Sequence, residues 1–280
     1  MCGSRARGRG CNTARVTIYG DLLRYRDLFA NLFRRDLELR YKGSALGVLW
    51  SLANPLVLMA VYALVFSVLW RAAPPELAPY PLFLLSGLVV WVFFSGSIQA
   101  AARSMVDNAP LIRKTRFPRQ LVPLSIVGTQ LVALGVMLVV LLPLNFVLLP
   151  ETRDTLWLAP PLALLVVALA AGIALAVASL NVVFRDVEHL VSALLLPWFF
   201  LTPILYTREA LPSADWGWLL DVLHWVNVVA PAVSAVRDPL FFGTLPQLGD
   251  VLYLAVAAVV SLAFGAWVFG RVDDRIAVEL

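Results

Sequence analysis

Six long stretches of the chain contain no Asp, Glu, Lys or Arg, and short polar segments that hold almost all of the charge separate them. Each stretch is close to the ~20 apolar residues that a helix needs to cross a bilayer. We therefore predict an all-α membrane protein with six transmembrane helices. The predicted spans are approximately 46–70, 80–101, 120–147, 157–183, 190–206 and 251–270.

A further apolar stretch, 222–236, also lacks these four residue types but contains His224, Asn227 and Pro231. As a helix it would measure roughly 22 Å, which is shorter than a hydrocarbon core of about 30 Å. We predict a re-entrant or interfacial hairpin over about 219–240 on the extracytoplasmic side, packed against protein that satisfies its broken backbone. Counting this stretch as a seventh span would place the C-terminus outside.

The distribution of basic residues favours six spans with both termini in the cytoplasm, because cytoplasmic loops carry an excess of Lys and Arg. Of the 22 Lys and Arg residues, the six-span topology places four on the outside, namely Arg71, Arg153, Arg208 and Arg237. The formal net charge of +4 then follows from topology and from attraction to membrane lipids with anionic headgroups. No nucleic-acid partner is expected.

The composition excludes several classes of protein. Hydrophobic residues make up 61% of the chain and charged residues 14%, against about 25% charged in soluble domains. A water-soluble enzyme and a disordered chain are therefore excluded. No catalytic group and no metal site are expected, since the two histidines, His189 and His224, fall in separate loops on opposite sides of the membrane.

The chain also lacks the groups that would let it power transport by itself. No Asp, Glu, Lys or Arg lies within the six predicted spans, whereas secondary transporters usually keep one for ion coupling. Neither Lys42 nor Lys114 follows a Gly-rich phosphate loop, so ATP binding of that kind is excluded. A transporter of this composition would draw its energy from a separate subunit. Two other classes are alternatives to a transporter: a membrane scaffold and an intramembrane hydrolase that uses Ser97.

The N-terminal segment divides into two parts. Residues 1–20 are small, basic and Gly-rich and are predicted to form a disordered tail. Residues 21–44 place apolar side chains at helical spacing among charged ones, which predicts an amphipathic helix in the cytoplasmic membrane interface. The interface residues singled out in it are Arg34, Arg35, Arg40 and Tyr41. The sequence favours a plain anchor over a lever that links a partner to the first span. At the other end, residues 273–280 are predicted to be a cytoplasmic tail.

Two cytoplasmic loops are candidate contacts for a partner protein. Between the second and third spans, apolar and basic residues mix in a pattern that suits a short helix docked into a groove of a partner. These residues are Leu111, Ile112, Arg113, Lys114, Arg116 and Phe117. A snorkelling basic loop is the alternative, but it leaves the apolar residues unexplained. After the fourth span, Arg185 and Asp186 either pair with each other or a partner, or form a solvated turn.

Several segments, in order along the chain, carry a resemblance to a known family. They are RRDLELRYKGSALGVLWSLANP (34–55), LIRKTRFPR (111–119), NVVFRD (181–186), TPILY (202–206) and the outer-loop segment 227–238. Together they resemble the signatures of ABC-2 type permeases that export polysaccharides. That group includes O-antigen, capsule and teichoic-acid transporters. Each motif is short, and the specificity lies in the ordered series.

The resemblance implies an ABC-2 type transmembrane domain over 45–272, which acts as half of a transporter in a bacterial plasma (inner) membrane. Two copies would form the pore, and two copies of a separate ABC ATPase, which binds ATP and Mg²⁺, would dock below. The 104–117 segment then resembles a coupling helix, 184–189 a smaller contact and the hairpin an outer gate. The substrate would be a lipid-linked glycan moved outward; export of a drug or a lipid is the alternative.

Candidate residues for the glycan path come from three of the spans. Aromatic faces can stack on sugar C–H groups, and hydroxyl or amide side chains can hydrogen-bond to sugar hydroxyls. The candidates are Tyr62, Phe66, Trp91, Phe94, Ser97, Gln99, Trp198 and Phe199. For each aromatic side chain, contact with lipid or packing between helices is the alternative.

Overall fold

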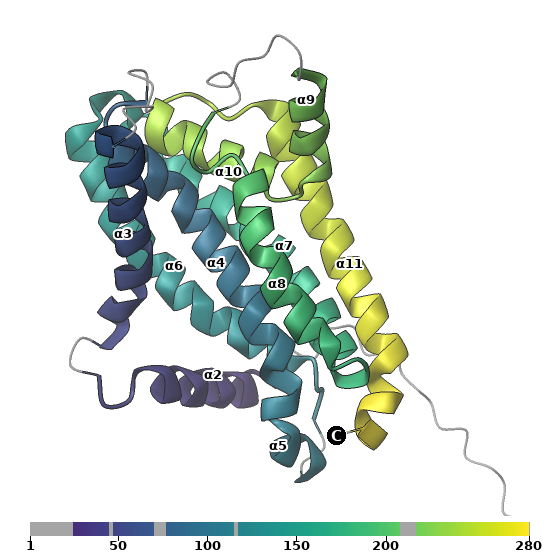
Figure 1. Ribbon diagram of the computed structural model, residues 1–280. Helices are drawn as coiled ribbons and strands as arrows, with labels where there is room; N and C mark the ends of the chain where they lie inside the picture. The colour runs from purple at the N-terminus through teal and green to yellow at the C-terminus, as the bar shows by residue number, and fades with distance from the viewer. Residues whose placement is uncertain (1–24, 45–46, 70–76, 115–116, 208–216, 280) are drawn as a thin grey trace, which may run out of the picture.

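The computed structural model describes residues 25–44, 47–69, 77–114, 117–207 and 217–279, and within them the chain forms helices and turns without any β-strand (Figure 1). The predicted all-α class is confirmed for this part of the chain. The tail predicted over residues 1–20 lies outside the described residues.

The described residues form ten α-helices. They are α2 (Arg26–Tyr41), α3 (Trp50–Ala63), α4 (Tyr80–Asp107), α5 (Ala109–Lys114), α6 (Leu121–Leu148), α7 (Ala159–Val183), α8 (Asp186–Leu201), α9 (Gly217–Val226), α10 (Ala230–Arg237) and α11 (Leu248–Glu279). Wider π-helical turns extend α3 over Leu64–Leu69 and α10 over Asp238–Phe242, and 3₁₀ turns occupy Gly47–Leu49, Pro150–Thr152 and Leu156–Leu158. The predicted tail from residue 273 is a continuation of α11.

Among the described residues, four helical segments are long and apolar enough to cross a membrane. They are Tyr80–Asp107, Leu121–Leu148, Leu156–Val183 and Leu248–Asp273, which match the second, third, fourth and sixth predicted spans. The first predicted span appears as the shorter apolar helix Trp50–Phe66. The fifth appears as α8, whose 16 residues measure roughly 24 Å. The protein is thus a multi-pass membrane protein, and its count of six spans remains a prediction.

The predicted hairpin over 219–240 corresponds to α9 and α10, helices of 10 and 8 residues that the turn 227–229 joins. Each is too short to cross a bilayer. Both lie at one end of the bundle, which we call the α10 end, whereas α2 and α5 lie at the opposite end, the α2 end (Figure 1). Two short helices suit a hairpin, whose depth in the membrane remains a prediction.

The central helix of the bundle is α4, which packs against α3, α6, α7, α8 and α10. Its large side chains Phe83, Phe93 and Phe94 are fully enclosed. In contrast, α6 and α11 leave apolar residues such as Val139 and Val259 exposed. Such surfaces are unfavourable in water, but lipid tails are as apolar as the side chains they would meet. The pattern of exposure therefore matches a bundle whose outer helices face lipid.

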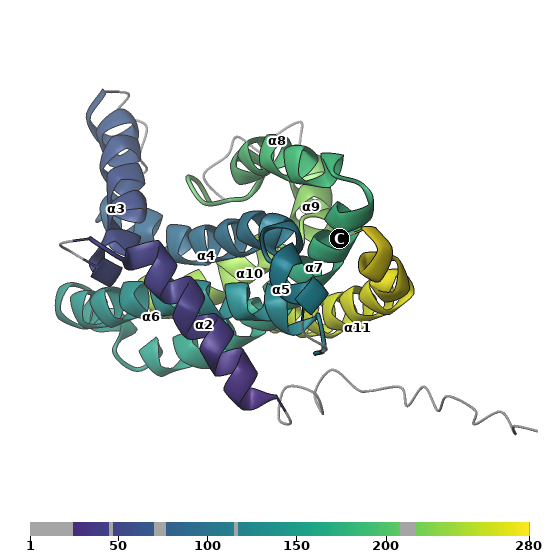
Figure 2. The same ribbon diagram turned by 90° about the horizontal axis from the view of Figure 1, so that it is seen from below.

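The N-terminal helix α2 lies across the ends of the long helices instead of along them (Figures 1 and 2). Its bounds, Arg26–Tyr41, fall within the predicted amphipathic segment. Leu32 is buried, and Phe29 and Phe33 lie against Gly128 of α6. An apolar side packed on the bundle and a charged side turned outward make α2 amphipathic.

Two glycines let α7 and α11 approach each other closely. A Cβ atom added to Gly265 would lie 2.1 Å from the carbonyl oxygen of Gly172, and one added to Gly172 would lie 2.2 Å from the carbonyl carbon of Ser261. The Ser261 hydroxyl also donates a hydrogen bond to the carbonyl oxygen of Leu169 at 3.2 Å. Small residues allow this backbone contact, which stabilises helix pairs in lipid.

The variant Gly265→Ala is expected to lower the stability by roughly 1–3 kcal/mol, because its methyl group forces the two backbones apart. Gly270→Ala on the same helix is the matched control, since nothing lies within 4 Å of its Cβ position. The control should melt at an unchanged or slightly higher temperature, as Ala favours helix. Thermal unfolding in detergent measures both, and equal melting temperatures would contradict the close contact.

Candidate functional site

The apolar residues of the predicted coupling segment hold α5 to its own bundle. Ile112 is 7% exposed and belongs to an apolar cluster with Leu32 of α2 and Leu121 of α6. Leu111 and Phe117 pack against the same cluster. The sequence favoured these residues as anchors in a partner groove, whereas in the single chain they fix the position of α5.

The charged residues of both predicted contacts face outward at the α2 end. Arg113 and Lys114 are exposed at the end of α5. Arg185 is exposed in the turn between α7 and α8, and Asp186 is exposed as the first residue of α8. Arg116 lies outside the described residues. The carboxylate of Asp186 lies in the first turn of α8, where its negative charge interacts favourably with the positive end of the helix dipole. These elements therefore expose charged side chains together with the ring of Phe184, which is 61% exposed.

Polar contacts tie the start of α8 to α4. Asn181 donates from Nδ2 to the carbonyl oxygen of Ala102 at 2.8 Å, and its Oδ1 accepts the backbone N–H of Glu188 at 2.9 Å. The Glu188 carboxylate forms an ion pair with Arg103 of α4 at 3.2 Å. A displacement of α4 at the α2 end would therefore act directly on the beginning of α8.

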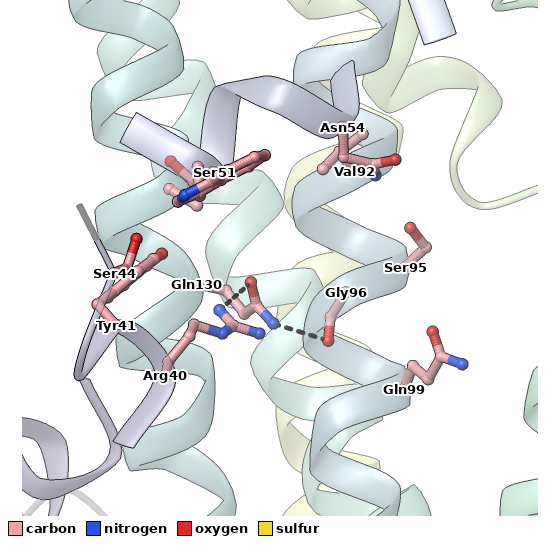
Figure 3. A pocket seen from close by; sticks show the side chains of 12 residues that line it. Arg40, Tyr41, Ser44, Ser51, Asn54, Val92, Ser95, Gly96, Gln99 and Gln130 are labelled. Atoms are coloured by element: carbon pink, nitrogen blue, oxygen red, sulfur yellow. Dashed lines mark hydrogen bonds between the residues drawn. The ribbon is translucent and has the colours of Figure 1, made fainter. Parts of the chain in front are cut away.

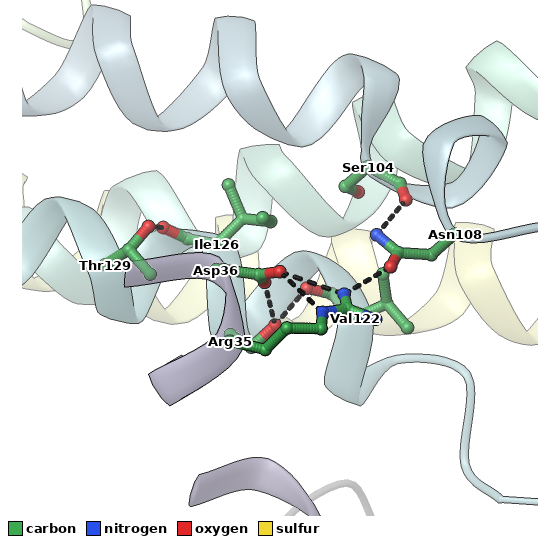
Figure 4. A network of polar contacts seen from close by, with 8 residues as sticks. Arg35, Asp36, Ser104, Asn108, Val122, Ile126 and Thr129 are labelled. Carbon is green, nitrogen blue, oxygen red and sulfur yellow. Dashed lines mark hydrogen bonds and ion pairs between the residues drawn. The ribbon is translucent and has the colours of Figure 1, made fainter. Parts of the chain in front are cut away.

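A second polar network connects α2 with the junction of α4 and α5 and with α6 (Figure 4). Arg35 pairs with Asp36 at 2.9 Å and also donates to Oδ1 of Asn108, the residue between α4 and α5. The Ser125 hydroxyl of α6 donates to Asp36 at 3.3 Å. Asn108 is held in turn by its bond from Nδ2 to the carbonyl oxygen of Ser104 at 2.8 Å. Of the predicted interface residues, Arg35 thus links α2 to α5, while Arg34 is exposed.

A polar cavity of about 540 Å³ lies where α2 ends, between α3, α4 and α6 (Figure 3). It is lined by Arg40, Tyr41, Ser44, Trp50, Ser51, Asn54, Val92, Ser95, Gly96, Gln99, Gln130 and Ala133. We call it the Arg40 cavity. Arg40 donates from Nη1 to Oε1 of Gln130 at 2.9 Å, and Gln130 donates from Nε2 to the carbonyl oxygen of Gly96 at 3.0 Å. The cavity brings together Arg40 and Tyr41 of the predicted interface set with Gln99 of the predicted path.

Most of the predicted path aromatics form one cluster between α3, α4 and α8. Phe94 lies edge-on to Trp198 with ring centroids 5.3 Å apart, and Trp91 lies edge-on to Phe199 at 5.6 Å. Tyr62 stacks on Phe199 at 5.5 Å. Trp91, Phe94 and Phe199 are buried within the single chain. In the single chain, these three rings pack between helices.

The remaining path candidates take separate positions. Phe66 lies near Tyr80 with ring centroids 6.3 Å apart. Ser97 is fully buried, and its hydroxyl has no hydrogen-bond partner among the described residues. Gln99 is exposed and borders the Arg40 cavity. Among the path candidates, Gln99 is the one that lines this cavity, and its role in a glycan path remains a prediction.

Arg237 in α10 is a buried residue whose role the sequence analysis missed. It is 3% exposed and donates hydrogen bonds to the carbonyl oxygens of Pro203 at 2.6 Å and Ile204 at 2.9 Å. Its guanidinium also lies 4.1 Å from the centre of the Phe83 ring. The turn that follows α8, the hairpin and α4 are thereby joined at the α10 end. The available signal was that Arg237 is the one basic Lys or Arg residue in the predicted hairpin 219–240.

The sequence of the chain is similar to that of known transport proteins. The family described as ABC-2 type transporter matches residues 27–241. The O-antigen export system permease protein RfbA of Myxococcus xanthus is 32% identical over 256 residues, which cover 91% of this chain and 95% of that protein. The Klebsiella pneumoniae protein of the same name is 31% identical and covers 90% and 94%. The polysialic acid transport protein KpsM of Escherichia coli is 24% identical and covers 84% and 89%. With the family match spanning most of its length, this chain belongs to the ABC-2 type transporter family.

Proposed function

We propose that this chain is the membrane-spanning permease subunit of an ATP-driven exporter that moves a lipid-linked polysaccharide from the cytoplasm across a bacterial plasma membrane. The observation that carries the proposal is the similarity, along 84–91% of the chain, to relatives named for O-antigen export and polysialic acid transport. O-antigen and polysialic acid are both glycans, which favours a glycan over a drug or a simple lipid as the cargo.

The energy is proposed to come from a separate ABC ATPase that binds ATP and Mg²⁺. The sequence supports this division, because neither of its lysines follows a phosphate-binding loop and no Asp, Glu, Lys or Arg lies within the predicted spans. Two copies of the chain and two ATPase subunits would make the transporter. A pair of permeases can enclose a continuous path for a polymer that is longer than the membrane is thick.

The α2 end is proposed to face the cytoplasm and the ATPase. Most basic residues of the chain then lie on the cytoplasmic side, as the positive-inside rule requires. Both termini are cytoplasmic in this orientation. Arg113 and Lys114 are the exposed cations that a carboxylate-lined groove of the ATPase would accept.

Movement of the ATPase is proposed to reach the membrane through α5. Because α5 follows α4 directly after Asn108, and Arg35 binds Asn108, a push on α5 would displace both α4 and α2. The contacts of Asn181 and Glu188 with α4 would pass the displacement on to α8. These links support the lever interpretation of α2 over a plain anchor.

Reversing two charges on α5, in the double variant Arg113→Glu/Lys114→Glu, is expected to weaken binding of the ATPase by at least about fivefold. Each exposed ion pair contributes ~0.5–1 kcal/mol, and reversal adds repulsion. The matched control is Arg34→Glu/Arg271→Glu, which reverses two exposed cations on other helices. Recovery of the ATPase on the tagged permease measures the effect, and equal recovery for both double variants would refute the coupling assignment.

The cargo is tested in proteoliposomes that contain the permease with its ATPase. Radiolabelled lipid-linked polysaccharide is presented on the side where the ATPase lies, and ATP should move it into the lumen, where glycosidases added outside cannot reach it. A fluorescent drug-like amphiphile is the control cargo and should not move. Transport of the amphiphile with no transport of the polysaccharide would overturn the proposed function.

A further inference from the structure

The Arg40 cavity has the composition of a binding site. Hydroxyl and amide side chains make up much of its lining, and the indole of Trp50 and the phenol of Tyr41 border it. Arg40, Trp50 and Gln99 of this lining are exposed, so a ligand can reach them. A cavity of about 540 Å³ is within the size range of small-molecule sites. The lining therefore suits a ligand that offers hydrogen-bond acceptors and hydroxyl groups.

Arg40 is the charged group of this cavity, and no carboxylate of the described residues lies within 4.0 Å of it. At the same end of the bundle, Arg35 pairs with Asp36 and Arg103 pairs with Glu188. Arg40 instead binds the neutral amide of Gln130. An amide orients a guanidinium but does not neutralise it, and most of the five N–H groups of Arg40 stay available. The cavity thus holds a positioned cation without a counter-ion from the protein.

Position along the membrane identifies the class of anion. Arg40 is in the last turn of α2, the amphipathic helix that lies across the bundle end (Figures 1 and 2). Helices of this kind lie at the level of lipid headgroups. The anions at that depth are phosphate groups esterified to lipids. A guanidinium binds phosphate through paired N–H donors, and more strongly than an amide or a hydroxyl can.

We propose that the Arg40 cavity binds the phosphate group of a lipid, with Arg40 as the cation and Gln130 as the residue that positions it. Ser95 and Gln99, one helical turn apart on α4, continue the polar lining away from Arg40 together with Asn54 of α3 (Figure 3). This continuation fits hydroxyl groups attached to the phosphate. The source is either a bulk phospholipid or the carrier phosphate of the glycan cargo; the second assignment rests on the proposed function.

Binding of three probes to the purified permease–ATPase complex in detergent tests the site. They are geranylgeranyl diphosphate, phosphatidylglycerol and, as an uncharged control, geranylgeraniol. We expect the diphosphate to bind at least about tenfold more tightly than the alcohol. Arg40→Gln should abolish that difference, and Arg40→Lys should retain part of it. Arg34→Gln, an exposed Arg on the same helix, should leave binding unchanged.

The near-isosteric variant Gln130→Glu keeps Arg40 but supplies the missing carboxylate, so it should also abolish the preference for the diphosphate. A melting temperature and elution profile like those of the unaltered protein show that each variant is folded. Equal Arg40-dependent binding of phosphatidylglycerol would support a phosphate site whose ligand is bulk lipid. Unchanged diphosphate binding in both Arg40→Gln and Gln130→Glu would overturn the proposal.

This outcome is separable from the cargo experiment. Arg40-dependent binding without polysaccharide transport would leave the phosphate site standing and reject the proposed function. Polysaccharide transport without Arg40-dependent binding would support the proposed function and reject the phosphate site.

Discussion

The absence of water from the bilayer core decides where this chain can place its polar groups. No Asp, Glu, Lys or Arg interrupts the predicted spans, and within these spans neutral amides make polar links between elements. Asn181 of α7 and Gln130 of α6 each donate a hydrogen bond to a backbone carbonyl of α4. Asn145 of α6 donates to the carbonyl oxygen of Leu240 at 2.6 Å. Such amides satisfy backbone groups without the cost of burying a charge. The remaining stability comes from close packing, as at Gly172 of α7.

The described part of the chain deviates from this arrangement at Arg237, which is buried at the α10 end. Its charge is met by two backbone carbonyls and by the face of Phe83. Nearby, the Trp198 indole donates to Oδ1 of Asn227 at 2.7 Å, so the hairpin is also bonded to α8 itself. Polar contacts concentrate at the two ends of the bundle, while the middle is apolar. An assembly of this kind suits rigid helices that are moved from their ends.

Hydrophobic spacing predicted the long helices and the amphipathic α2 because these depend on local sequence. It was less informative wherever burial depends on a distant segment. The sequence predicted Arg237 as a cation of the outer loop, but the fold brings the turn at Pro203 against it. The sequence also did not reveal that Ile112 packs in one apolar cluster with Leu121. The Arg40 cavity could not be foreseen either, since it joins residues from four helices. The length of the stretch without charged residues also predicted a fifth span at 190–206, whereas α8 begins at Asp186 and ends at Leu201.

The central claim is that this permease is a passive path whose motor is another protein. Its most direct test is uptake of labelled lipid-linked polysaccharide by proteoliposomes that contain the permease alone, under an imposed proton or sodium gradient, compared with vesicles that also contain the ATPase and ATP. We expect uphill transport only when the ATPase and ATP are both present. Uphill transport by the permease alone, driven by the ion gradient, would contradict the account.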